Sequence, residues 1–155
     1  EGGGTCASST RGVLAGGGNI QRMDYVTIMT TGDTKDFGDL SATVTSGTGL
    51  SNSTRGVFKI GFQSGFTNAL EYITIATLGN STDFGDALNV NSSLAMGASP
   101  TRGIIAGGAS PSSPYPRVNV IQKIEILTTG NAIDFGDLNF ASSHPAGLTN
   151  GHGGL

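Results

Sequence analysis

The amino-acid sequence predicts an all-β domain built from three copies of a four-stranded unit. A motif that opens with Thr-Arg-Gly and closes with Asp-Phe-Gly-Asp occurs three times. Its openers begin at Thr10, Thr54 and Thr101, and a period of about 45 residues is typical of stacked or radial repeat proteins. Each copy also contains an alternating apolar run, and no segment has a useful helical period.

The composition indicates a nearly uncharged, hydroxyl-rich surface. Charged residues make up 12% of the 155 residues, about half the usual share in a soluble domain. This surface fits an extracellular or particle-bound protein better than a cytosolic one. A net charge of −3 gives no basic footprint for nucleic acid, and no apolar run approaches the roughly 18 residues of a membrane span. Cys6 is the only cysteine, so it forms no disulfide within the chain, and we expect a buried thiol.

Each opener predicts a short strand that is covered on both faces. In the first copy, small apolar residues run without alternation from Arg11 to Gly17. The run ends in Gly16-Gly17-Gly18, where glycine permits positive φ and close backbone approach. The third copy keeps the pair as Gly107-Gly108, whereas the second has Lys59-Ile60-Gly61-Phe62 at this place. The connections that follow differ among the copies, which is typical of loops on a binding face. They are residues 19–22, 63–69 and 109–118.

The middle of each copy predicts a β-hairpin. In the first copy, a β-branched strand from Met23 to Thr30 precedes the turn Thr31-Gly32-Asp33. The hairpin therefore spans Tyr25 to Leu40. Each closer places a phenylalanine between aspartates, and we expect these three rings to be equivalent anchors in the core. They are Phe37, Phe84 and Phe135.

The remaining segments complete one domain over residues 1–155. Residues 41–52, 89–99 and 139–149 are expected to hold a weaker outer strand and the crossing to the next repeat. The repeats then cover about 5–47, 48–94 and 95–147, and 148–155 resembles the start of a fourth opener. The chain begins at Glu1, partway through an inter-repeat segment and with no signal peptide nearby. We therefore expect a piece of a longer protein.

The order of opener, glycine pair, variable loop, apolar strand, turn and aromatic closer resembles the kelch repeat. That resemblance implies four-stranded blades of a β-propeller. The chain departs from kelch in using phenylalanine where tryptophan is usual and in lacking the glycine pair in the second copy. It is more similar to the tandem repeats of marine bacteriophage, especially cyanophage, virion proteins. Tyr72 to Leu88 and Thr101 to Gly108 carry that likeness almost residue for residue.

Three blades do not close a propeller, because a closed ring needs about four to eight. We therefore expect a second chain or a longer polypeptide to complete the ring, and open strand edges favour such association. A β-trefoil or β-prism also fits three four-stranded units of this length and remains an alternative.

The charges that recur in each repeat allow two interpretations. Each repeat has one opener arginine and one aspartate pair, which suggests a structural ion pair. The aspartate pairs could instead bind calcium, although they lack the EF-hand spacing. We expect no catalytic residue, cofactor or metal site. The predicted structural anchors are Arg11, Phe37, Asp39, Arg55, Phe84, Asp86, Arg102, Phe135 and Asp137.

The phage resemblance implies a non-enzymatic virion structural protein. It would be a tail, fibre or capsid-surface component that attaches to a host. Tyr115 and Arg117, in the proline-rich connection of the third copy, are candidate contacts to a ligand. Expected partners are other copies of the chain, other virion proteins and a host glycan or receptor, without nucleic acid or membrane insertion. The alternative is a secreted, lectin-like carbohydrate-binding propeller module.

Overall fold

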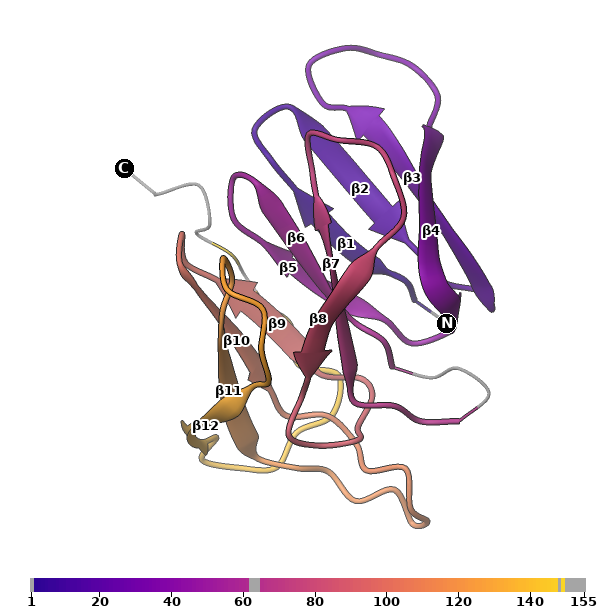
Figure 1. Ribbon diagram of the computed structural model, residues 1–155. Coiled ribbons are helices and arrows are strands. Elements are labelled where there is room, and N and C mark those ends of the chain that lie inside the picture. The colour runs from indigo at the N-terminus through magenta and orange to yellow at the C-terminus, as the bar shows by residue number, and fades with distance from the viewer. Residues whose placement is uncertain (1, 62–64, 148, 150–155) are drawn as a thin grey trace.

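The computed structural model of the protein describes residues 2–61, 65–147 and 149. As the sequence predicts, these residues are all-β and form three four-stranded antiparallel sheets (Figure 1). Each sheet pairs its strands in chain order. The strands are β1 (Gly4–Ala7), β2 (Arg11–Ala15), β3 (Ile20–Thr27), β4 (Lys35–Val44), β5 (Thr48–Ser51), β6 (Arg55–Lys59), β7 (Ala69–Thr74), β8 (Thr82–Asp86), β9 (Ala95–Ala98), β10 (Arg102–Ala106), β11 (Val120–Glu125) and β12 (Ile133–Asp137).

We call β1–β4 the first sheet, β5–β8 the second and β9–β12 the third. Their registers are equivalent: Val13 lies opposite Tyr25, Val57 opposite Tyr72, and Ile104 opposite Lys123. An irregularity also recurs at the same place between the last two strands of each sheet. The three sequence repeats therefore correspond to three copies of one local structure. The described residues contain no helix that is long and apolar enough to cross a membrane.

The sheets pack face to face, with their first strands side by side. Strand β5 lies between β1 and β9 in this inner row. We call the face that a sheet turns toward the next sheet along the chain its front, and the opposite face its back. The front of the first sheet packs on the back of the second, and the front of the second packs on the back of the third. Each interface is an apolar core because the inward residues alternate along the strands.

The two cores use equivalent positions. The first core includes Val13, Met23, Phe37, Phe58 and Ile75. The second includes Val57, Leu70, Phe84, Ile105 and Ile126. Each closer phenylalanine that has a following sheet is therefore buried against it.

The back of the first sheet and the front of the third sheet have no neighbouring sheet. The expected burial of the opener strand and of the closer ring is therefore wrong at these two faces. On the back of the first sheet, Leu14 is 47% exposed, so its opener strand is not covered on both faces. On the front of the third sheet, Phe135 is 51% exposed, whereas Phe37 and Phe84 are 2% exposed. The backbone positions are equivalent, but no following sheet covers the third ring.

Some expected strand positions also differ from the structure. The strand expected from Met23 to Thr30 spans Ile20–Thr27 instead, and a turn with a bond from Thr30 N to Thr27 O follows it. The closers themselves form the outermost strands β4, β8 and β12, so the weaker outer strands expected after them are wrong. The segments after the first two closers hold the crossing and the next inner strand. Of the fourth opener expected at 148–155, only Thr149 is among the described residues.

Candidate functional site

Two of the opener arginines, Arg11 and Arg55, join neighbouring sheets, but not through the aspartates that the sequence suggested. Arg11 stacks on Tyr25, with its guanidinium carbon 4.5 Å from the ring centroid. Its Nη1 donates to the carbonyl of Ile75 in the second sheet at 2.7 Å. Arg55 repeats the arrangement with Tyr72, at 4.2 Å, and with the carbonyl of Ile126 in the third sheet, at 3.0 Å. A planar cation between a ring and a carbonyl is a stable inter-sheet link.

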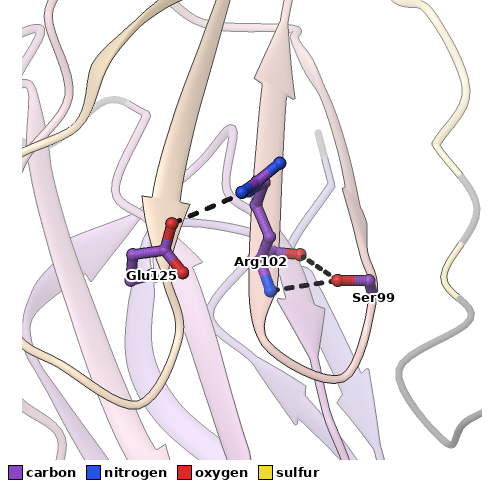
Figure 2. A network of polar contacts seen from close by, with 3 residues as sticks. All are labelled: Ser99, Arg102 and Glu125. Carbon is purple, nitrogen blue, oxygen red and sulfur yellow. Dashed lines mark hydrogen bonds and ion pairs between the residues drawn. The ribbon is translucent and has the colours of Figure 1, made fainter.

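Arg102, the third opener arginine, has no following sheet to meet. Figure 2 shows it beside Glu125 on the adjacent strand and near Ser99 at the turn. Its Nε lies 3.6 Å from a carboxylate oxygen of Glu125, and its backbone N donates to Ser99 Oγ at 3.0 Å. Its guanidinium lies 6.0 Å from the centre of Phe135, on the same open face. Both partners of the Arg102–Glu125 pair are about half exposed, so this pair contributes little stability. The expected pairing of opener arginines with closer aspartates is wrong at all three positions.

The closer aspartates act through their backbones. Asp39 N donates to Asn80 Oδ1 and Asp86 N donates to Asn131 Oδ1, each at 3.0 Å and each across an inter-sheet boundary. The carbonyls of these two aspartates also accept bonds from the next sheet. Within the described residues, no group of three His, Cys, Asp or Glu side chains is placed to hold a metal ion. The calcium interpretation therefore has no geometric support in that part of the chain.

Lys59 is a buried cation that the sequence reasoning did not single out as a site. It occupies the place of Ala15 and Ala106 in the other sheets, where the second repeat departs from the glycine pair. The residue is 1% exposed, and its Nζ lies 3.0 Å from Ile60 O and 2.5 Å from Thr67 O. Burial lowers the pKa of this amine from 10.5 to about 8, partly opposed by the charge of Asp86. The amine is therefore held by backbone carbonyls, those of Ile60, Thr67 and Asn91.

The free energy of unfolding should rise with pH between 8 and 10.5 because of Lys59. In this window the unfolded chain keeps a proton on the amine that the folded chain has lost, so raising the pH favours folding. The change in pKa corresponds to about 3 kcal/mol. Urea denaturation across this pH range should show the rise in the parent chain and not in a Lys59→Met variant.

Cys6 has the opposite effect on how the free energy of unfolding changes with pH. The parent and the Lys59→Met chains should therefore both carry Cys6→Ala. As expected, this thiol is buried, and burial raises its pKa from 9.0 to about 12. Above pH 9 the unfolded chain loses a proton that the folded chain keeps, and the stability contributed by the neutral thiol is lost as pH rises toward 12. If the free energy of unfolding changed equally with pH in the parent and Lys59→Met chains, the rise would not be due to Lys59.

The predicted contact loop connects β10 to β11 and projects from one end of the third sheet (Figure 1). Its base is held by the bonds Val118 N to Gly108 O and Ser110 N to Pro116 O. Tyr115 is 59% exposed and has a positive φ of 61°, which non-glycine residues seldom adopt. Arg117 is also exposed. A fixed loop thus presents an aromatic ring and a cation to solvent.

A second candidate surface is the open front of the third sheet. A hollow of about 680 Å³ lies there. Its lining includes Ala95, Arg102, Ile104, Ala106, Phe135 and Gly147. The equivalent front residues of the other two sheets are covered by a neighbouring sheet. The shape and apolar character of this hollow therefore suit a further sheet.

Repeated side chains bind neighbouring sheets, and the exposed ring and cation of one loop could bind a polar ligand. No protein-family model matches the chain, and the search of curated proteins finds no match either.

Proposed function

We propose that the chain is part of a β-propeller in which each four-stranded sheet is one blade. The support is the packing of successive sheets face to face, with their first strands forming an inner row. The sequence likeness to kelch repeats points the same way. A β-trefoil is the weaker interpretation, because a trefoil closes a barrel and the described strands form three separate open sheets.

Within that architecture, the chain serves as a non-enzymatic structural component of a virus particle that contacts a host surface. The observation that carries this function is the contrast between repeated sheets and unlike connections at one end of them. The β2–β3 connection is short, whereas the β10–β11 connection is long and presents Tyr115 and Arg117. Rigid repeats with variable loops let the contact surface change without disturbing the core. Cyanobacterial cells are the first cells to test, because the repeats are similar to those of cyanophage virion proteins.

Binding to cyanobacterial cells and to their isolated envelope polysaccharide tests this function. The double variant Tyr115→Ala, Arg117→Ala should bind at least about tenfold more weakly, because exposed tyrosine and arginine are frequent contact hot spots. Lys35→Ala is the matched control, since Lys35 is an exposed cation at the start of β4, away from the β2–β3 and β10–β11 connections. Equal binding by the double variant and the parent chain would contradict the role of the loop.

A secreted carbohydrate-binding module is the second candidate, and one observation favours it. Equivalent hollows lie at the β7–β8 and β11–β12 hairpins, with volumes of about 240 and 310 Å³. Thr77 and Asn80 line the first, and Thr128 and Asn131 line the second. One sugar site per sheet predicts more than one bound glycan per chain by calorimetry, unaffected by changes at Tyr115. A single site that depends on Tyr115 would favour host attachment instead.

A further inference from the structure

The two faces without neighbours carry the two halves of an interface that already occurs twice within the chain. At both internal interfaces, two carbonyls of an outermost strand accept bonds from the hairpin turn of the next sheet. The bonds are Gly79 N to Phe37 O (2.8 Å), Ser81 N to Asp39 O (2.9 Å), Gly130 N to Phe84 O (2.7 Å) and Ala132 N to Asp86 O (2.7 Å). The spacing along the chain is the same in both cases.

Three kinds of side-chain bond are also common to both internal interfaces. An asparagine of the turn accepts from an aspartate amide, an opener arginine donates to a strand-end carbonyl, and a buried Glu or Gln accepts from the amide after the closer. In the last case, Ser41 N donates to Glu71 Oε2 at 3.1 Å, and Leu88 N donates to Gln122 Oε1 at 2.6 Å. These two acceptors are almost fully buried, so losing their donors would be costly.

The open faces present the matching groups at the equivalent positions. The front of the third sheet has the Arg102 guanidinium, the carbonyls of Phe135 and Asp137, and the amides of Asp137 and Asn139. The back of the first sheet and its turn have the Ile28 carbonyl, the amides of Gly32 and Thr34, and the carboxylates of Asp33 and Asp24. Each of the donors named here has an acceptor among the groups named on the other face. Asp24 now pairs with the exposed Arg22 instead.

The apolar positions match in the same way. Ile75 and Ile126 are buried against the preceding sheet, but Ile28, their equivalent in the first sheet, is 51% exposed. Phe135 is the exposed equivalent of the closer rings that share a core with Ile75 and Ile126. Ile28 and Phe135 can therefore bury each other's surface, and such burial is the main driving force of association.

Glycines occupy the positions of close approach at the internal interfaces and the equivalent positions on the open faces. A Cβ at Gly103 would lie 2.6 Å from Leu50 Cδ2 of the preceding sheet, and a Cβ at Gly85 would lie 2.6 Å from the Gly130 backbone of the following one. Gly12 and Gly136 hold these positions on the open faces, where no other sheet comes within 4 Å. Each open face thus has the small residue that close docking requires.

We propose that the front of the third sheet binds the back of the first sheet of a second copy of this chain, head to tail. The geometry is that of the two internal interfaces, so it continues an arrangement the chain already uses. Such contacts are heterologous, and they close when the two copies also meet at their other faces. Three sheets from each copy would then form a ring within the usual propeller range of about four to eight. This inference rests on the proposed propeller architecture and not on the virion role.

One segment of the chain competes for part of this site. Thr149 Oγ1 lies 3.1 Å from Ala98 O, as Ser51 Oγ lies 2.8 Å from Ala7 O, so Thr149 occupies the place of an inner strand beside β9. The second copy would bring its own inner strand, β1, to that place. Association should therefore be measured on the full chain and on a chain that ends at Pro145.

Native mass spectrometry and sedimentation at up to about 100 μM, above the Kd range of most specific interfaces, provide the first test. We expect dimers of the full chain or of the shortened chain. Monomers in both would overturn the proposal, whatever the host-binding experiment shows. Conversely, dimers without binding to cells would contradict only the virion role.

Variants of the two open faces provide the second test. Ile28→Asp and Phe135→Asp should each weaken association at least about 100-fold, because each places a charge in an apolar contact. Both residues are exposed in the single chain, so circular dichroism should show that these variants still fold. Leu127→Asp is the matched control: this residue is exposed at a hairpin that is itself docked on the second sheet, and its change should leave association intact.

An equimolar mixture of Ile28→Asp and Phe135→Asp chains decides whether the contact is head to tail. Each variant retains the face that the other has lost, so the mixture should regain one intact interface and form a heterodimer. Differential isotope labelling identifies that species by mass. Persistent dimers of either single variant, or a mixture that stays monomeric, would overturn the proposed interface.

Discussion

Replacing Phe84 with alanine should lower the free energy of unfolding by about 3–5 kcal/mol. The same change at Phe135 should lower it by less than about 1 kcal/mol. The two rings occupy equivalent backbone positions, but Phe84 is buried between the second and third sheets while Phe135 faces solvent. Phe84 also makes an edge-to-face contact with Tyr72, at 6.1 Å between ring centroids. The third sheet has Lys123 in place of that tyrosine.

Urea denaturation of dilute protein measures this difference without a contribution from association between chains. Phe37→Ala serves as a second buried case, because Phe37 packs against Tyr25 and the second sheet in the same way. It should behave like Phe84→Ala. A loss at Phe135 as large as that at Phe84 would mean that the third closer is covered in solution even at low concentration.

The architecture within one repeat could be predicted from the sequence because its determinants are local. The opener, the alternating strand and the closer each fix a strand or turn through nearby residues. The glycine pair illustrates this: Gly16, Gly17, Gly107 and Gly108 all have positive φ, as their place after the opener strand predicted. All-β structure and three four-stranded units followed from such signals.

The environment of a repeat could not be predicted in the same way, because it depends on a neighbour. Leu14, Ile28 and Phe135 have the identity of core residues and are exposed only because no sheet follows or precedes theirs. A periodic pattern reports that a residue suits an interface, and it does not report whether that interface is filled. The same reason explains why equivalent phenylalanines have unlike surroundings.

The hydrogen-bond partners of the charged side chains could not be predicted from the sequence either. Counting one arginine and one aspartate pair per repeat suggested an ion pair, but the guanidinium of Arg11 bonds a backbone carbonyl of the next sheet. Every residue has a backbone carbonyl, so the sequence does not show which one will accept a bond from an arginine. Lys59 could have been recognised from its place, since it replaces a small buried residue in a repeat that otherwise keeps its apolar pattern.

Gly85→Ala should destabilise the chain by about 3–6 kcal/mol, and Gly136→Ala by only about 1–3 kcal/mol. Both glycines have a positive φ, 135° and 144°, so alanine suffers comparable backbone strain at either place. At Gly85, the added Cβ would also lie 2.6 Å from the backbone of Gly130, which cannot move without separating the third sheet from the second. At Gly136 nothing lies within 4 Å.

The comparison of these two variants isolates the close approach between sheets from the strain within one sheet. A displacement at Gly85 would also break the bond from Gly130 N to Phe84 O, and hydrogen exchange of the Gly130 amide should report it directly. Gly136→Ala should leave that amide protected. If both variants lost the same stability and the Gly130 amide remained protected in both, the glycines would be explained by conformation alone. The tight docking of one closer on the next hairpin would then no longer account for their repetition.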